Sequence, residues 1–349
     1  MCGADAPRRW PPAGLPASTK PRPGPRIPLR PVDSLTVTTL VDNVYDVFMS
    51  DQGPAHRAGP GSTTGRVAVA TMAGGCAPDQ LIAEHGFSLL LTVTTGAETH
   101  RLLFDCGVSP DGMVENMRRL DIDARDVEAV VLSHGHFDHT GGLDGLVRTL
   151  GRPRLPVLIH PDFWNRRRIT LPGRDPVEMP TTSRGALEGA GFEVIEEGRP
   201  SFLFEGSVLV TGEVDRTTDY EPGFPLQEAW RGARWEPDPL VLDDQAVLVN
   251  VRDRGLVVIT GCGHSGVVNT TRYAQALTGV ERLGAVIGGF HLSGPLFESI
   301  IDRTCADLLA LDPGIVVPGH CTGWRGQHAL ARAFGERFVP SCVGTRFEF

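Results

Sequence analysis

Apolar runs separated by polar turns recur along the chain from residue 35 onward. The first, LTVTTLVDN at residues 35–43, alternates β-branched and polar side chains, which is typical of a half-buried strand. Similar runs at residues 87–93 and 100–105 predict two further strands, and a helix is expected over residues 112–120.

Strand-like and helical segments then alternate through the rest of the chain. Strands are expected at residues 127–133, 155–160, 207–214, 246–251, 255–261, 284–289 and 314–319, and helices at residues 141–150, 183–191, 269–277 and 295–311. Early strands joined by turns, followed by this alternation, favour an α/β fold in which two sheets lie between layers of helices.

Three segments do not fit this pattern. Residues 1–34 are expected to form a disordered tail, because nine prolines and six basic residues in the first 31 positions are opposed by Asp5 alone. Residues 52–79, rich in glycine, alanine and proline, are interpreted as an insertion loop. Residues 215–238 contain five prolines and glycines, and such a long irregular stretch is typical of a lid or a disordered loop. Residues 35–349 are predicted to form one domain.

Composition narrows the classes of function. Hydrophobic residues make up 41% and charged residues 21%, which is typical of globular proteins. No run approaches 18 apolar residues, so a membrane span is not expected. A net charge of -9 argues against nucleic-acid binding, which requires a basic face. Seven cysteines without a repeated spacing do not indicate a disulfide framework and favour a reducing cytoplasm. A small-molecule substrate is expected, and a homo-oligomer is compatible with these properties.

The most specific signal is VVLSHGHFDHTGGL at residues 130–143, which places His134, His136, Asp138 and His139 within six residues. His134 and His136 are two residues apart, so in an extended turn both can face the same ion. Four ligands from so short a loop cannot easily surround one tetrahedral ion. We therefore expect two ions, each with additional ligands from elsewhere in the chain. Imidazole and carboxylate ligands suit zinc, iron, manganese or cobalt.

Other polar residues stand at the carboxyl ends of predicted strands, where ligands bind in layered α/β folds. They are Asp105, His160, Glu213, His264, His291 and His320. Residues far apart in the sequence are thus expected to meet in one cleft.

Together these motifs resemble the metallo-β-lactamase superfamily, whose HxHxDH signature stands here as His134, His136, Asp138 and His139. LFDCG at residues 103–107 and VVPGHCTG at residues 316–323 resemble two further superfamily strands. The segments LTVTTLVDN, AEHGFSLLL, TGEVDR, VITGCGHSGVVNT and IGGFHL resemble a subfamily of metal-dependent hydrolases often labelled methanopterin-precursor (dihydropterin-ribofuranosylaminobenzene phosphate) synthases. The resemblance implies an αβ/βα sandwich of two mixed sheets flanked by helices, with two metal ions between the sheets.

The resemblance also implies a ligand set. His134 and His136 would hold the first ion with a further histidine, and Asp138, His139 and His320 the second. Many members carry a bridging aspartate where this chain has GCGH at residues 261–264. His264 is expected to be the missing ligand of the first ion, and Cys262 is the alternative, as a thiolate ligand. Asp105 is expected to orient a ligating histidine.

Several residues are candidates for catalysis and substrate binding. Asp138 is expected to orient a hydroxide, and His291 or His264 to donate a proton to the leaving group. His291 is also a candidate ligand or substrate contact, and His160 is either structural or part of the pocket. Candidate substrate contacts are His85, Arg216 and Cys262. The basic run NRRR at residues 165–168 is either a solvated helix face or an anion contact.

The function predicted from these residues is hydrolysis of a small, anionic phosphoester or heterocyclic substrate by a metal-bound hydroxide. It would require two divalent metal ions, with zinc favoured and manganese or iron as alternatives. Two other functions are compatible with the sequence. One is an iron-dependent redox enzyme of the same fold, although no added flavin-binding or rubredoxin-like domain is visible. The other is a non-catalytic, metal-stabilised ligand-binding protein.

Overall fold

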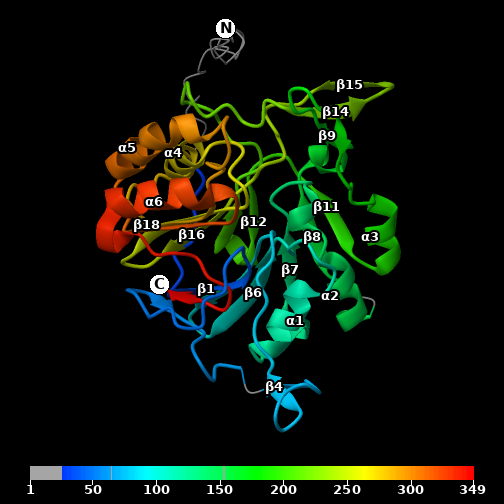
Figure 1. Cartoon of the computed structure of the whole chain (residues 1–349). Coiled ribbons are helices and arrows are strands. Elements are labelled where there is room, and N and C mark those ends of the chain that lie inside the picture. Colours follow the sequence, from blue (N-terminus) through cyan, green and yellow to red (C-terminus); the bar gives the residue numbers. More distant parts are fainter. Residues whose placement is uncertain (1–25, 64, 152–153) are drawn as a thin grey trace, which may run out of the picture.

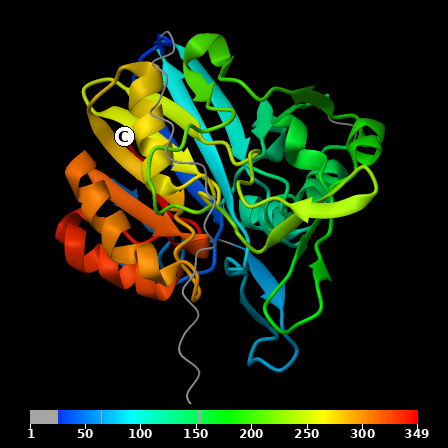
Figure 2. The same ribbon diagram turned by 90° about the horizontal axis from the view of Figure 1, so that it is seen from above.

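Two mixed β-sheets face each other at the centre of the molecule, and helices cover the outer face of each (Figure 1). The computed structural model describes residues 26–63, 65–151 and 154–349. Seen from above, the sheets lie between the yellow-to-red helices of the second half of the chain and the cyan-to-green helices of the first half (Figure 2). This arrangement is the expected sandwich of sheets flanked by helices.

Within the described residues, eight strands form the larger sheet. Their order is β11 (Glu193–Glu196), β8 (Pro156–Ile159), β7 (Ala129–Val131), β6 (Glu98–Phe104), β5 (Ser88–Thr95), β1 (Ser34–Val41), β20 (Arg346–Glu348) and β2 (Ala55–His56). The first four are parallel, and the pairs from β6 to β2 are antiparallel. The outer face of this sheet packs against α1 (Gly112–Arg119), α2 (Leu143–Leu150) and α3 (Arg184–Ala190).

The smaller sheet has six strands in the described part of the chain. Their order is β12 (Ser201–Leu203), β13 (Val208–Val210), β16 (Val247–Val251), β17 (Gly255–Thr260), β18 (Leu283–Gly289) and β19 (Ile315–Gly319). The last three are parallel. Its outer face is covered by α4 (Val267–Thr278), α5 (Ile301–Leu311) and α6 (Gly323–Phe334). Short 3-10 helices occur at η1 (Ala124–Asp126), η2 (Phe137–His139), η3 (Pro161–Trp164), η4 (Phe204–Gly206), η5 (Glu298–Ile300), η6 (His320–Thr322) and η7 (Gly335–Arg337).

The main core lies between the two sheets. In β17, Val257 and Ile259 belong to this core, whereas Leu256 and Val258 belong to the cluster beneath α4. Because both faces of the strand are buried, its sequence is a continuous apolar run and not an alternating one. None of the helices in the described residues combines the length and the apolar composition needed to cross a membrane.

Ordered structure begins earlier than the sequence predicts. Residues 26–34 were expected in the disordered tail, but Leu29 is buried, Val32 pairs with Val251 beside the smaller sheet, and β1 begins at Ser34. Apolar side chains spaced among the prolines provide the surface for this packing. The rest of the predicted tail, residues 1–25, lies outside the described residues.

The segment expected to be an irregular lid contains a hairpin. β14 (Gln227–Arg231) and β15 (Arg234–Pro237) pair with each other, and β14 also pairs with β9 (Arg167–Ile169), which pairs with β10 (Val177–Glu178). Trp230 lies opposite Trp235, and Gly232 has the positive φ of 66° that tight hairpin turns require. The prediction of an irregular segment was therefore wrong for its second half. The hairpin lies at the top right of Figure 1.

The insertion at residues 52–79 is also partly regular. It contributes β2 to the edge of the larger sheet and carries a small hairpin of β3 (Arg66–Ala68) and β4 (Cys76–Pro78). Strands of two or three residues are too short to show an alternation of apolar and polar residues in the sequence.

Glu221 closes the N-terminus of α4 from a distant part of the chain. Its carboxylate accepts hydrogen bonds from the backbone nitrogens of Val268 (2.9 Å) and Asn269 (2.9 Å). Gly266 leaves room for this carboxylate, since a Cβ there would collide with it. Burial raises the pKa of Glu221 to about 7, although these hydrogen bonds and Arg216 oppose the shift.

This raised pKa predicts a pH-dependent stability. The folded state binds the proton of Glu221 more tightly than the unfolded chain, so the free energy of unfolding falls as the pH rises from about 5 to about 7. The contribution lost is about 3 kcal/mol. Glu221→Gln is expected to flatten this slope in urea unfolding at about pH 5 and about pH 8. The exposed Glu193→Gln serves as the control, and equal slopes in the two variants would contradict the assignment.

Candidate metal centre

The HxHxDH loop follows β7 and turns sharply at its glycines. A Cβ at Gly135 would collide with the carbonyl oxygen of Phe163, and one at Gly141 with that of Val108. These close backbone approaches pack the loop between β7 and η2 against neighbouring segments, and His136 lies immediately before η2. The loop therefore brings all of its polar side chains to the carboxyl end of the sheet.

The first ligand group consists of three buried histidines. Nε2 of His134 lies 2.9 Å from Nδ1 of His136. The ring of His264 lies 4.8 Å from that of His134 and 4.9 Å from that of His136, measured between centroids. Among the described residues, neither ring nitrogen of His264 has a hydrogen-bond partner.

These three imidazoles are held neutral. Burial lowers the pKa of His134 and of His264 well below the ordinary value, and neighbouring imidazoles add to the shift. Burial, with the charge of Arg167, lowers the pKa of His136 to about 4. Neutral rings keep the nitrogen lone pairs that bind metal, so this group has the chemistry expected for the first ion.

A second ligand group lies beside the first. It consists of Asp138, His139, Cys262 and His320, whose candidate ligand atoms lie within 4.8 Å of one another. The carboxylate Oδ2 of Asp138 is 3.3 Å from Nε2 of His320 and 3.8 Å from Nε2 of His139. Nε2 of His139 is 3.1 Å from the sulfur of Cys262. The residues predicted for the second ion are thus brought together.

Cys262 belongs to both groups. Its sulfur also lies within 4.8 Å of ligand atoms of His134 and His264. The sequence left His264 and Cys262 as alternatives for one ligand position, and the fold places both of them next to the loop histidines. Cys262 lies two residues after the end of β17, in the GCGH stretch where this chain departs from the pattern that the resemblance implies.

Asp105 holds the loop and one ligand ring in place. One of its oxygens, Oδ1, accepts a hydrogen bond from the backbone nitrogen of Ser133 (2.7 Å). The other, Oδ2, accepts from the Ser133 hydroxyl (2.7 Å) and contacts Nδ1 of His139 (2.6 Å). Burial alone would lower the pKa of His139, but the carboxylates of Asp105 and Asp138 outweigh it and raise this pKa to about 9. With Nδ1 facing Asp105, Nε2 of His139 faces the ligand group.

Replacing Asp105 with asparagine is expected to weaken metal binding about 10- to 100-fold, because the His139 ring loses the acceptor that orients it. The dissociation constant would be measured by competition with a metal indicator dye. The exposed Asp126→Asn, which alters a surface ion pair with Arg101, should leave it unchanged. Equal affinities for both variants would argue against an orienting role for Asp105.

His291 and His85 lie at the edge of the two groups. The His291 ring is 4.2 Å from that of His264, and its φ is 47°. Neither of its ring nitrogens has a hydrogen-bond partner among the described residues, and its ligand atoms lie close to those of Cys262 and Cys321. His85 is exposed, with its ring 5.1 Å from that of His320. Both histidines therefore lie beside candidate metal ligands.

The matching family model, described as Metallo-beta-lactamase superfamily, covers residues 84–277, which is more than half of the chain. The chain belongs to the metallo-β-lactamase superfamily. The HxHxDH loop, Asp105 and Cys262 all lie within the matched residues.

Two curated proteins of Methanocaldococcus jannaschii are similar to this superfamily member. One is named 7,8-dihydropterin-6-methyl-4-(beta-D-ribofuranosyl)-aminobenzene-5'-phosphate synthase, with 29% identity over 76% of this chain and 90% of the relative. The other is the uncharacterised protein MJ0448, with 28% identity over 76% of this chain and 93% of the relative. The crystal structure of Tm1679, a metal-dependent hydrolase of the β-lactamase superfamily, covers 89% of this chain and 98% of its own with a TM-score of 0.65 and 23% identity. The last comparison establishes the fold that the sequence predicted.

The guanidinium of Arg216 is hydrogen-bonded to the backbone and is not a free cation at the candidate metal centre. It donates hydrogen bonds to the backbone carbonyl oxygens of His264 (3.2 Å) and Leu240. It therefore supports the loop that carries His264. His160 likewise has local partners, since its Nδ1 accepts a hydrogen bond from the backbone nitrogen of Asp162 at 3.1 Å.

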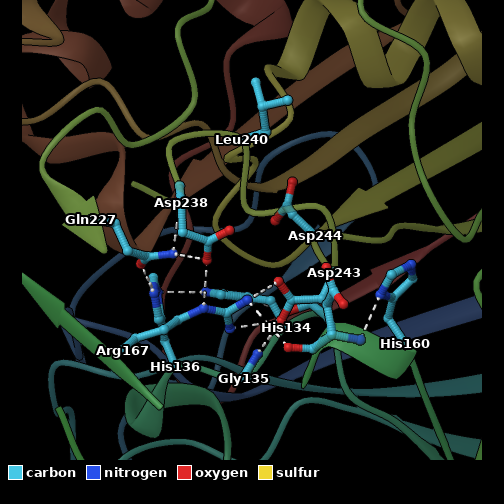
Figure 3. A network of polar contacts seen from close by, with 12 residues as sticks. His134, Gly135, His136, His160, Arg167, Gln227, Asp238, Leu240, Asp243 and Asp244 are labelled. Carbon is cyan, nitrogen blue, oxygen red and sulfur yellow. Dashed lines mark hydrogen bonds and ion pairs between the residues drawn. The ribbon is translucent and has the colours of Figure 1, made fainter. Parts of the chain in front are cut away.

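The basic run NRRR was expected on a helix face or at an anion site, but it leads into strand β9 and its arginines are paired. Arg167 is 2% exposed and lies between two buried carboxylates, contacting Asp238 (3.1 Å) and Asp243 (2.9 Å) (Figure 3). Arg166 pairs with Glu178 and Arg168 with Glu228. All three arginines thus form ion pairs with carboxylates of the fold.

This buried network, which no local sequence pattern indicates, reaches the candidate metal ligands. Asp243 accepts a hydrogen bond from the backbone nitrogen of Gly135 (2.8 Å), and Gln227 Oε1 lies 2.6 Å from Nε2 of His136. Gln227 also donates to Asp238 (3.0 Å). The network therefore fixes which nitrogen of His136 faces His134. The consecutive acids at residues 243 and 244 gave no signal that a distant arginine would pair with the first of them.

Proposed function

We propose that this protein is a dinuclear metal-dependent hydrolase. The observation that carries the proposal is the pair of adjacent buried ligand groups that share Cys262. Neutral imidazoles, a carboxylate and a cysteine are donors that suit zinc, with manganese or iron as alternatives. Buried histidine nitrogens without hydrogen-bond partners among the described residues fit the same interpretation.

When bound, two ions would lower the pKa of a water molecule and polarise a carbonyl or phosphoryl oxygen of the substrate. His134, His136 and His264 would hold one ion, and Asp138, His139 and His320 the other, with Cys262 between them. Asp138 would orient the attacking oxygen through its carboxylate. His291, whose ring nitrogens have no internal partner among the described residues, would donate a proton to the leaving group.

The substrate class that we propose is a small anionic molecule, either a phosphoester or a heterocycle, and not a nucleic acid. Because Arg166, Arg167, Arg168 and Arg216 are engaged elsewhere, the anionic part would face the metal ions and His85. The name of the methanogen relative mentions both a pterin and a phosphate, which supports this class.

The proposal is tested by turnover with defined metals. Protein purified without chelators would be loaded with zinc or manganese and assayed on bis(4-nitrophenyl) phosphate and on a simple lactone. We expect phosphodiester hydrolysis that chelation abolishes and metal restores. Full metal loading without turnover of either substrate would favour a ligand-binding protein, and activity that requires iron and oxygen would favour the redox alternative.

A further inference from the structure

An apolar cavity of about 410 Å³ lies next to the metal centre. Its walls come from three separate segments, the loop after β9, the segment before β14 and the loop after β18. Leu171, Pro172, Phe224, Leu226, Leu296 and Phe297 supply most of the lining. Ser293 is the one polar side chain in this lining, and no charged residue takes part. An ionic group would thus find no counter-charge there among the described residues.

Phe224 lines this cavity and also contacts the candidate metal centre. Its ring stacks on that of His264 at 5.7 Å with an interplanar angle of 10°. It also lies 5.4 Å from the ring of His291 and 6.0 Å from that of Phe297, on the cavity side. A molecule with its reacting bond beside His264 and His291 would therefore place the adjoining group against Phe224.

The volume and lining suit a ring. Small-molecule sites are mostly apolar cavities of roughly 300–1,000 Å³. Aromatic rings such as those of Phe224 and Phe297 favour stacked or edge-to-face contacts with another ring. A larger cavity of about 860 Å³ lies near Arg254 and Arg282, and none of the metal-ligand candidates lines it.

We infer that this cavity binds an uncharged aromatic group that the substrate retains next to the bond that is hydrolysed, and not the leaving group. The inference rests on the proposed hydrolase function and adds a second requirement to the substrate. An anionic group would face the metal ions, and an aromatic group attached to it would lie against Phe224.

Two phosphodiesters with the same leaving group test this inference. Bis(4-nitrophenyl) phosphate and methyl 4-nitrophenyl phosphate both release 4-nitrophenolate when water attacks phosphorus, and they differ only in retaining an aryl or a methyl group. The variant is Leu171→Asn, which makes the cavity wall polar without adding charge. Leu171 is 39% exposed, so the substitution should not disturb the core. The control is Val177→Asn on β10, which is 62% exposed and outside the cavity.

We expect Leu171→Asn to lower kcat/KM for the aryl substrate about tenfold and to leave the methyl substrate within about twofold. Val177→Asn should change neither. Equal losses on the two substrates, or no loss on either, would overturn the assignment of the cavity.

A binding measurement separates this inference from the proposed function. Fluorescence titration of the metal-loaded protein with 1-anilinonaphthalene-8-sulfonate requires no turnover, and this probe carries both an anion and aromatic rings. We expect Leu171→Asn to weaken its binding about tenfold relative to Val177→Asn. If the wild-type protein hydrolyses neither phosphodiester, the hydrolase proposal fails, and the titration still decides whether the cavity binds aromatic groups. Equal dissociation constants for the two variants would refute the cavity assignment.

Discussion

Replacing Asp138 with asparagine is expected to reduce hydrolysis of bis(4-nitrophenyl) phosphate about 10³-fold. Asp138 is the one carboxylate in the ligand group of His139, Cys262 and His320. Burial opposes its ionisation, but His139 and His320 hold the pKa of Asp138 well below its ordinary value, so it stays a carboxylate. Asparagine has a similar shape but no charge. It can therefore neither balance the positive charge of a metal ion nor orient the attacking oxygen as a carboxylate does.

Asp144→Asn is the matched control for this experiment. Asp144 is exposed on α2, only six residues from Asp138, and its partner is Arg148. The activity of the Asp144→Asn variant should equal that of the wild-type protein. If Asp138→Asn keeps its activity within tenfold of the control while binding metal, a role for Asp138 in orienting the attacking oxygen is ruled out.

The second large effect concerns stability. Arg167→Met is expected to lower the free energy of unfolding by about 3–5 kcal/mol, because it leaves the buried carboxylate of Asp243 without its counter-charge and that of Asp238 with Arg231 alone. The neighbouring Arg166→Met should cost less than about 1 kcal/mol, since Arg166 pairs with Glu178 at the surface. Urea unfolding of the two variants compares the free energies of unfolding after the same substitution at neighbouring positions.

A triple variant checks the cause of this loss. Adding Asp238→Asn and Asp243→Asn to Arg167→Met removes the unbalanced charges and should restore part of the stability. If Arg167→Met and Arg166→Met are equally stable, or if the triple variant is less stable than Arg167→Met alone, burial of unpaired charge is not the reason for the loss.

Local periodicity was enough to predict the layered fold. The helix expected over residues 112–120 is α1 (Gly112–Arg119), and the apolar runs before Asp105, His134 and His320 are core strands β6, β7 and β19. These elements carry their signal within a few consecutive residues. The carboxyl ends of parallel strands meet at one edge of a sheet, so the convergence of polar residues could also be anticipated.

The remaining features depend on partners far apart in the sequence. β14 is stabilised by cross-strand contacts with β9, about 60 residues earlier. The proline and glycine content of residues 215–238 alone indicated an irregular segment. The pairing of Arg167 with Asp243 spans 76 residues, and that of Arg216 with the His264 carbonyl oxygen spans 48. No local pattern distinguishes such a buried arginine from one that binds an anion, which is why Arg216 was expected to contact substrate.

The number of metal ions per chain shows whether the two ligand groups hold two metal ions. Protein purified without a chelating tag would be analysed by elemental mass spectrometry beside His136→Ala. We expect about two zinc or manganese ions per chain in the wild-type protein and a large loss in the variant. Absence of metal from both proteins would mean that these residues do not form a metal centre, and about one iron per chain would favour the redox alternative.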